Sequence, residues 1–484
     1  MSDAIRGLEP ALLWKYFAEI SRIPRGSKNE TAVARYVVEA ARKLGLEVRQ
    51  DKVGNVVVRK PASRGREGRK SVCLQGHLDM VCEKNADKQH DFQKDPITIV
   101  RKDNVLMADG TTLGADNGIA VATNLALMEA SDIEHGPLEF LFTIDEETGL
   151  TGANNLQSDF VRSRTLINLD SEEEGALYVG CAGGKDSVGA WKIEREPALG
   201  GCIGLKIMVK GLKGGHSGLE IDKGRANALK LLARTLLPLE EMGLRIVELS
   251  GGSKRNAIPR EAHALCCLPA GKLDELRRSV AATESTLKDA FATTDPDLAI
   301  TVEKVDPAPA QVLKAKKASA ILKTIRALPH GVIRMSADIP GLVETSTNVA
   351  VITTEEKKVE LATSQRSSVP SEILEIAAGV KTVFELGGAK VVQSAGYPSW
   401  KPNLRSEILA VAKRSYSELF GQAPHVKAIH AGLECGIIGE KYPGMDMVSC
   451  GPTLEGVHSP DEKIHIDTVG RYLQLVLRTL KNVI

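Results

Sequence analysis

Residues 137–149 read PLEFLFTIDEETG, a largely apolar run that ends in three consecutive carboxylates. Such a run predicts a buried β-strand, here over 137–144, with charged groups at its carboxyl end. Similar strand patterns occupy 53–60 (VGNVVVRK), 71–76 (SVCLQG) and 165–170 (TLINLD), and residues 117–130 show helical spacing. Because strands and helices alternate over residues 1–180, we expect an α/β domain with a largely parallel sheet.

The remaining chain shows two further kinds of pattern. Helical spacing over 11–20 and 31–44 precedes the first strand, and the α/β pattern returns near the end with a helix over 404–419, a strand over 445–450 and a helix over 467–481. The middle predicts two β-α-β-β-α units. The first comprises a strand at 203–210, a helix at 223–243, strands near 245–250 and 261–268 and a helix at 272–292; the second comprises a strand at 298–304, a helix at 311–328, strands at 346–353 and 357–363 and a helix at 370–387.

The composition is that of a globular protein. Of 484 residues, 43% are hydrophobic and 26% charged, with 63 Lys and Arg against 62 Asp and Glu. A net charge of +1 and 4% aromatic residues give no support for nucleic-acid or anionic-membrane binding. Since no signal peptide, long apolar run or C-x-x-C pair occurs, we expect a cytoplasmic protein without a transmembrane helix or a structural zinc ribbon.

Five clusters of acidic, histidine and amide residues stand at predicted strand ends, at a helix start or in a loop. They are QGHLDM (75–80), LGADNG (113–118), DEETG (145–149), NLDSE (168–172) and GVHSPDE (456–462). Ligands and catalytic groups gather at the carboxyl ends of strands in open α/β sheets. Carboxylates and imidazoles crowded there need a compensating cation, and two divalent ions that share one carboxylate would supply it.

Each cluster alone also has an ordinary structural interpretation. A single H-x-D step is a weak signal, the Glu146-Glu147 pair could be solvated surface charge, and Asp116 could be a helix cap. In the extended HLD segment, His77 and Asp79 face the same side, so that Asp79 could orient His77 as a ligand. The five clusters together, rather than any one of them, predict a metal site.

The segments HLDMV (77–81), GADNGI (114–119), DEETG (145–149), NLDSEEEG (168–175) and VHSPDE (457–462) stand in the order seen in the M20 family of dinuclear zinc peptidases, which the chain resembles over essentially its whole length. The segments KGLKGGHSG (210–218), RNAIPREA (255–262) and HAGLECG (430–436) are similar to its aminoacyl-histidine dipeptidase subfamily.

The resemblance implies a particular architecture. We expect a zinc-exopeptidase-like (phosphorylase/hydrolase-like) α/β catalytic domain over 1–186 and 398–484, interrupted by an α+β lid over 187–397 that contains the two β-α-β-β-α units. Many members of the family have a lid about half this size and dimerise through it. A doubled lid would perform within one chain what two subunits do there, which permits a monomer and leaves a homodimer through other surfaces open.

The resemblance also implies the metal ligands. His77 and Asp170 would bind one zinc ion, Glu147 and His458 would bind the other, and Asp116 would bridge the two. The peptide bond after Asp116 is expected to be cis. Carboxylate and imidazole ligands also accept manganese or cobalt, so the sequence leaves the identity of the two divalent ions open.

The catalytic roles that the resemblance implies are those of amide hydrolysis. Glu146 would be the general base toward a water activated by two zinc ions, and Asp79 would orient His77. In the lid, His216 would donate a hydrogen bond to the oxyanion of the tetrahedral intermediate.

A dipeptidase must also recognise the free carboxylate of its substrate. The resemblance implies that Arg366, whose guanidinium is planar and bidentate, takes this task and that Asn256 and the backbone of Gly432 assist it.

The function that follows is hydrolysis of unblocked dipeptides, including Xaa-His dipeptides. An N-acyl-amino-acid deacylase or a carboxypeptidase of the same superfamily is the alternative, since metal ligands cannot separate these enzymes. A catalytically inactive binding protein is a remote alternative, because all five ligand positions and Glu146 are present. The sequence leaves the preferred dipeptide and the cleavage of β-alanyl-histidine (carnosine) open.

Overall fold

The computed structural model describes residues 3–484, which divide into two compact units. Unit 1 comprises the chain up to Gly180 together with Pro402–Ala428 and Leu433–Ile484, and unit 2 comprises Cys181–Lys401 and Ile429–Gly432. The expected domain limits, with an insertion over 187–397, stay a prediction. Among the described residues, no helix combines the length and the apolar character needed to cross a membrane.

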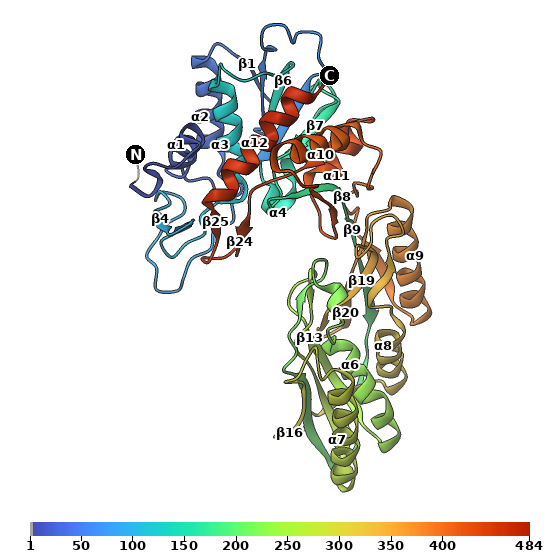
Figure 1. Cartoon of the computed structure of the whole chain (residues 1–484). Helices are drawn as coiled ribbons and strands as arrows, with labels where there is room; N and C mark the ends of the chain where they lie inside the picture. The colour runs from blue at the N-terminus through green and yellow to red at the C-terminus, as the bar shows by residue number, and fades with distance from the viewer. Residues whose placement is uncertain (1–2) are drawn as a thin grey trace. The chain divides into compact units, whose positions relative to one another are not determined.

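Unit 1 is built on a mixed sheet with the strand order β1-β2-β6-β3-β7-β23-β8-β22. Figure 1 labels β1, β6, β7 and β8 of this sheet. The neighbouring pairs β6-β3, β3-β7 and β7-β23 are parallel, as the alternating sequence pattern predicts, whereas β1, β2 and β8 pair antiparallel. The strands are β1 (Glu47–Gln50), β2 (Val56–Lys60), β3 (Val72–His77), β6 (Leu138–Thr143), β7 (Thr165–Asn168), β8 (Ala176–Cys181), β22 (His425–Ile429) and β23 (Asp446–Ser449).

Helices pack on this sheet, and its central strands β3 and β6 are buried along their whole length. The sequences of β3 (VCLQGH) and β6 (LEFLFT) are accordingly largely apolar rather than alternating, apart from Glu139, Thr143 and the polar carboxyl end of β3. The helices of unit 1 are α1 (Ala11–Ile20), α2 (Thr31–Lys43), α3 (Ala115–Glu129), α4 (Glu146–Gly149), α5 (Thr151–Asn155), α10 (Glu407–Phe420), α11 (Glu434–Lys441) and α12 (Ile466–Asn482), and a small sheet β24-β25-β5-β4 is formed by β24 (Leu454–Glu455), β25 (Lys463–His465), β5 (Val105–Ala108) and β4 (Ile99–Lys102).

Unit 2 contains one long sheet with the order β16-β11-β15-β13-β19-β20-β9-β21, and β18 pairs with β19. Helices α6, α7, α8 and α9 contact its strands. The main strands are β9 (Gly183–Lys192), β11 (Cys202–Lys210), β13 (Arg245–Gly251), β15 (Ala262–Pro269), β16 (Ala299–Val305), β18 (Gly331–Met335), β19 (Val343–Thr354), β20 (Lys358–Ser367) and β21 (Lys390–Gln393), the short strands are β10 (Arg195–Pro197), β12 (Gly215–His216), β14 (Ala257–Ile258) and β17 (Gln311–Leu313), and the helices are α6 (Ala228–Leu236), α7 (Leu273–Ala290), α8 (Ala315–Ala327) and α9 (Pro370–Leu386).

The repeat in unit 2 differs from the predicted one in its first strand. The strand at 298–304 was expected to open the second β-α-β-β-α unit, but β16 instead pairs with β11 and closes the first. The second repeat takes β9 as the corresponding strand, since β9 pairs with both β20 and β21. The strand order is therefore symmetric about the β13-β19 pair, and the first repeat is inserted into the second after β9.

Glycines explain why β9 carries so weak a strand pattern in the sequence. A Cβ on Gly189 would lie 2.2 Å from the ring of Phe384, and a Cβ on Gly184 would lie 2.4 Å from the ring of Tyr397. Glycine weakens the strand signal but permits this close approach of aromatic rings. Two predicted helices differ from the structure. The helix predicted over 223–243 is α6 followed by a 3-10 helix over Leu237–Met242, which contains Pro238. The helix predicted over 311–328 begins later, because 311–313 forms strand β17.

Candidate active site

The acidic and histidine clusters of unit 1 meet at one edge of its sheet. His77 is the last residue of β3, Glu146 and Glu147 open α4 just after β6, and Asp170 follows β7. Strand β3 lies between β6 and β7 and runs parallel to both, so their carboxyl ends emerge side by side. The location expected from the sequence is therefore the location that the topology produces.

A close contact between α3 and β3 joins Asp116 to this edge. A Cβ on Gly76 would lie 2.4 Å from Oδ1 of Asn117, so glycine is required beside the helix. Asn117 Oδ1 accepts a hydrogen bond from the backbone N–H of His77 at 3.1 Å, and its Nδ2 donates to the carbonyl of Leu169 at 3.0 Å. The peptide bond between Asp116 and Asn117 is cis, as expected.

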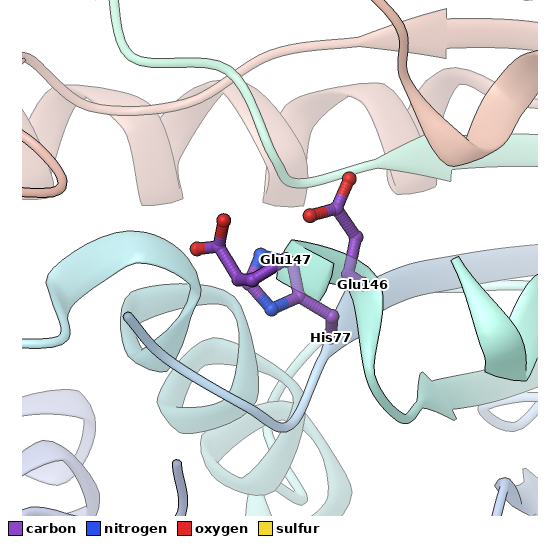
Figure 2. Close-up of side chains that lie close together, drawn as sticks. All are labelled: His77, Glu146 and Glu147. Atoms are coloured by element: carbon purple, nitrogen blue, oxygen red, sulfur yellow. The ribbon is translucent and has the colours of Figure 1, made fainter. Parts of the chain in front are cut away.

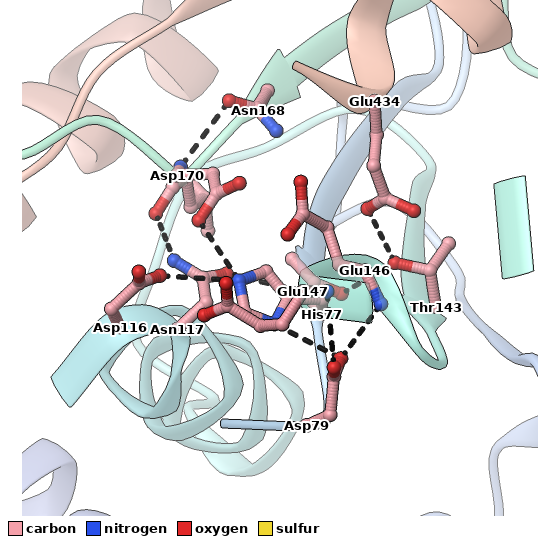
Figure 3. Close-up of polar contacts among 12 residues, drawn as sticks. His77, Asp79, Asp116, Asn117, Thr143, Glu146, Glu147, Asn168, Asp170 and Glu434 are labelled. Atoms are coloured by element: carbon pink, nitrogen blue, oxygen red, sulfur yellow. Dashed lines mark hydrogen bonds and ion pairs between the residues drawn. The ribbon is translucent and has the colours of Figure 1, made fainter. Parts of the chain in front are cut away.

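Asp116 stands between two pairs of side chains. Its Oδ1 lies 3.1 Å from Nε2 of His77, which is itself 3.4 Å from Oδ1 of Asp170 (Figure 3). Its Oδ2 lies 3.1 Å from Nε2 of His458, which is 3.0 Å from Oε2 of Glu147. One carboxylate thus offers one oxygen to each of two imidazole–carboxylate pairs.

Asp79 fixes the orientation of His77 from behind. Its Oδ1 lies 3.2 Å from Nδ1 of His77, and its carboxylate accepts backbone hydrogen bonds from Glu146 at 3.0 Å and Glu147 at 3.2 Å (Figure 3). It also accepts a hydroxyl hydrogen bond from Ser27 at 2.8 Å. Burial opposes the charged form of Asp79, but the contacts with His77 and these donors lower its pKa to about 2. Asp79 therefore stays ionised and directs Nε2 of His77 toward the site.

The electrostatics of the site call for a positive charge. Hydrogen bonds that His458 donates to the carboxylates of Asp116 and Glu147 raise its pKa to about 11. Burial alone would lower the pKa of His77, but Asp170 and Asp116 raise it well above its usual range. Burial raises the pKa of Asp170 to about 6. Without a cation, both imidazoles therefore hold protons at the positions where ligand nitrogens would bind a metal.

The donor set fits divalent cations. The groups His77-Asp116-Asp170 and Asp116-Glu147-His458 each bring one potential ligand atom per residue to within 4.8 Å of the others. Oε1 of Glu147 is buried and finds no hydrogen-bond partner in residues 3–484. Imidazole and carboxylate are suitable ligands for zinc, manganese or cobalt.

Glu146 differs from its neighbour Glu147 in its surroundings. Figure 2 shows the two carboxylates on either side of His77. Burial and the charges of Asp170 and Glu434 raise the pKa of Glu146 well above its usual range. A carboxyl group with a raised pKa beside a cluster of ligand residues suits proton transfer.

Three buried residues support the site and were not identified as supports from the sequence. The carboxylate of Glu462 accepts hydrogen bonds from four consecutive backbone N–H groups at the start of α3, those of residues 113–116, at 2.7 to 3.2 Å. The guanidinium of Arg25 donates to the carbonyls of Leu78 and Asp79 at 3.0 and 2.9 Å and also to that of Gly114. These contacts hold the loops of His77, Asp116 and His458 together.

The third support is Glu434, in the segment HAGLECG. Its Oε2 accepts a hydrogen bond from Oγ1 of Thr143, at the end of β6, at 2.6 Å (Figure 3). It accepts a second one from Nε2 of Gln75 in β3, also at 2.6 Å. The side chain is fully buried, and burial raises its pKa to about 7. Glu462 lies in VHSPDE (457–462) and Glu434 in HAGLECG (430–436), but nothing in the spacing of these segments identifies the partners of the two side chains.

The four predicted substrate contacts lie in unit 2. His216 Nδ1 accepts hydrogen bonds from the backbone N–H groups of Gly218 at 3.2 Å and Leu219 at 3.0 Å. The carbonyl of Asn256 accepts from Ser217 N at 2.8 Å, which places Asn256 beside His216. Because both backbone groups are donors, Nδ1 of His216 is unprotonated, and a neutral ring carries its proton on Nε2.

Arg366 joins the same cluster. A Cβ on Gly218 would lie 3.3 Å from Nε of Arg366, and Nη1 of Arg366 donates to Oη of Tyr397 at 2.8 Å. A Cβ on Gly432 would lie 3.0 Å from the Tyr397 ring. Arg366 and Asn256 both line a pocket of about 240 Å³. His216, Asn256, Arg366 and Gly432 are thus brought together within this unit, while their roles toward a substrate stay predictions.

Comparisons with known proteins agree with these features. Residues 73–482 match peptidase family M20/M25/M40. The cytosol non-specific dipeptidase of Escherichia coli is 44% identical over 477 residues, which cover 98% of each chain. A crystal structure of an aminoacylhistidine dipeptidase from Vibrio alginolyticus is similar at 45% identity, with a TM-score of 0.90 over 99% of this chain and 98% of that one. An aminopeptidase from Bacillus cereus shares the fold at 18% identity, with a TM-score of 0.62 over 98% of this chain and 99% of that one.

Proposed function

Because this chain belongs to peptidase family M20/M25/M40, we propose that it is a metal-dependent dipeptidase that hydrolyses unblocked dipeptides, including Xaa-His dipeptides. The family expected from the sequence motifs is confirmed. The observation that carries the proposal is the placement of Asp116, whose two oxygens face different imidazole–carboxylate pairs. The relatives that support the substrate class match almost the whole chain, including the part that forms unit 2.

Two divalent cations, most readily zinc, would be held by the five ligand residues. His77 and Asp170 would hold one, Glu147 and His458 the other, and Asp116 would contact both. Cations bound in this way lower the pKa of water and polarise the scissile carbonyl. The residues around the ligands would keep the site rigid before substrate arrives.

Glu146 is the residue to which we assign proton transfer. In its ionised form the carboxylate would take a proton from the attacking water, and the raised pKa of the group favours holding that proton until the amine leaves. The proton would then pass from the Glu146 carboxyl to the departing amine nitrogen as the C–N bond breaks. Glu146 would be ready for the next cycle once it has lost the proton.

Recognition of the substrate would rest on the cluster in unit 2. Arg366 is 7% exposed and has no ion-pair partner in residues 3–484, so a carboxylate ligand would compensate its charge. The proton on Nε2 of His216 would stabilise the oxyanion of the tetrahedral intermediate. Asn256 and the backbone of Gly432 would complete the contacts to the terminal carboxylate.

The cytoplasm is the location we propose, and small peptides are the partners. This follows the name of the Escherichia coli relative, a cytosol dipeptidase. N-acyl-amino-acid deacylation and carboxypeptidase activity would use the same ligands and the same terminal carboxylate. They differ from dipeptide hydrolysis only in the part of the substrate on the amino side of the scissile bond.

A hydrolysis panel followed by mass spectrometry tests the proposal. The zinc-loaded full chain is given alanyl-histidine, β-alanyl-histidine, a tripeptide and an N-acetyl amino acid, each with and without a chelator. Chelator-sensitive cleavage of the dipeptides, with the tripeptide and the N-acetyl compound left intact, is the expected result. Cleavage of the N-acetyl compound alone would replace the dipeptidase by a deacylase, and tripeptide cleavage that releases only the C-terminal residue would indicate a carboxypeptidase.

A further inference from the structure

The pocket beside Arg366 holds more positive charge than its own residues neutralise. Three cationic residues line it: Lys185, Arg255 and Arg366. Nζ of Lys185 donates to the carbonyl of Ser394 at 2.7 Å, and Arg255 forms an ion pair with Asp186 at 3.1 Å. Arg366, by contrast, is nine-tenths buried, its Nε finds no hydrogen-bond partner among residues 3–484, and its Nη1 donates to a neutral phenol.

Tyr397 is the phenol in question, and the backbone fixes its position. Its N–H donates to the carbonyl of Gly184 at 2.9 Å, and the N–H of Gly184 donates to the carbonyl of Tyr397 at 3.1 Å. Its ring lies close to Gly184 and Gly432, where any Cβ would meet the aromatic carbons. The ring is therefore held between Gly184 of β9 and Gly432 of the loop after β22, and its hydroxyl contacts Arg366.

The hydrogen bond to Arg366 determines what the hydroxyl can do next. A guanidinium N–H can only donate, so Oη of Tyr397 is the acceptor in this pair. A phenol carries one proton, and no acceptor in the described chain, residues 3–484, receives it from Tyr397. Burial raises the pKa of Tyr397, so the hydroxyl stays protonated at neutral pH.

We propose that the Tyr397 hydroxyl donates a hydrogen bond to the terminal carboxylate of the substrate, beside the guanidinium of Arg366. This inference rests on the proposed function and adds a specificity-determining residue to it. Arg366 supplies the charge, and the Arg366 N–H bound to Oη polarises the phenol, which strengthens it as a donor. A C-terminal amide would lose the charged interaction with both groups.

Direct binding to a turnover-deficient full chain tests the inference. The zinc-loaded Glu146→Gln chain, with and without Tyr397→Phe, is titrated calorimetrically with alanyl-histidine and with alanyl-histidinamide. We expect Tyr397→Phe to weaken binding of the free acid about 10-fold and to change amide binding less than 2-fold. Tyr36→Phe, which removes a hydroxyl that contacts Glu19 in unit 1, is the matched control and should change neither affinity.

The same titration in an Arg366→Gln background separates a direct contact from an effect through Arg366. If Tyr397 donates directly, Tyr397→Phe weakens acid binding there as well. The inference is overturned if the acid binds equally with and without the hydroxyl, if acid and amide are weakened equally, or if the effect vanishes in the Arg366→Gln background. Failure of the proposed function would appear separately, as absent dipeptide hydrolysis by the unsubstituted chain.

Discussion

Asp79 contacts His77 through Nδ1 at 3.2 Å and thereby leaves Nε2 of His77 as the only ring nitrogen that faces the site. The same carboxylate accepts the backbone N–H groups of Glu146 and Glu147. A single buried side chain thus sets the direction of one expected ligand and the start of the helix that carries another. His77 ends β3, and Glu146 and Glu147 follow the end of β6, its neighbour in the sheet.

Replacement of Asp79 tests this role. Asp79→Asn keeps the size of the side chain but removes the negative charge opposite Nδ1, so His77 is no longer held as a ligand. Metal affinity should fall about 10- to 100-fold, measured by competition with a chromophoric chelator. Asp87→Asn, at an exposed position, is the control. Equal metal affinity of Asp79→Asn and the parent chain would contradict the assigned role.

Glu462 provides a second test, at the start of α3. Glu462→Gln would face four backbone N–H donors with one acceptor oxygen and one NH₂ group, which leaves buried donors unpaired. We expect the free energy of unfolding to fall by about 2 kcal/mol, measured by denaturant titration of the metal-free protein. The neighbouring exposed Asp461→Asn should change it by less than about 0.5 kcal/mol. Equal losses in the two variants would show that the hydrogen bonds of Glu462 to the start of α3 do not stabilise the protein.

Metal loading should release protons. In the metal-free protein the pKa of His77 is raised well above its usual range and that of His458 is raised to about 11, so we expect both imidazoles to be protonated at pH 7.5. Ligation requires the neutral ring, so two cations should displace about two protons from these residues. Calorimetric titration in buffers of different ionisation enthalpy measures the number. Zinc binding without net proton release would show that these imidazoles are not ligands.

The buried Glu434 predicts a pH dependence of stability. Its pKa is about 7 in the folded chain against an ordinary value of 4.5, so the folded state favours its protonated form. The stability that comes from this protonation is complete below about pH 4.5 and is lost as the pH rises through about 7, at roughly 1.4 kcal/mol per pH unit. The Glu434→Gln variant has no titrating carboxyl group at this position and should not show this loss of stability.

Denaturant titrations of the metal-free parent and of Glu434→Gln between pH 5 and 8 measure the difference. The parent should lose stability relative to the variant up to about pH 7, and the gap should then stay constant. Parallel profiles over the whole range would mean that Glu434 titrates as it does in the unfolded chain.

The sequence predicts some parts of this molecule much better than others. The ligand cluster can be predicted from the sequence because each residue stands at the end of an apolar run or in a short motif, and sheet topology brings such ends together. The residues that support the ligands cannot be predicted in this way. Glu434 and Gln75 are 359 residues apart, and Arg25 and Gly114 are 89 residues apart, so only the fold reveals that they pair.

Strand β9 shows the corresponding limit for the fold. Glycines at 184 and 189 weaken its strand pattern, yet they are required by the rings of Tyr397 and Phe384. Because the sequence pattern does not predict β9, it places the strand at 298–304 in the second repeat, whereas β9 is the strand that pairs with β20 there. Tyr397 was missed for a related reason, since its contact with Arg366 depends on the pairing of residue 397 with Gly184.

The measurement that tests the central claim most directly combines metal content and turnover in one sample of Glu146→Gln. We expect about two zinc ions per chain, as in the parent, and a loss of alanyl-histidine hydrolysis of about 100- to 10,000-fold. The exposed Glu39→Gln is the control and should match the parent in both readings. Full metal content with undiminished turnover would contradict the assignment of Glu146 as the general base and, with it, the mechanism proposed for this site.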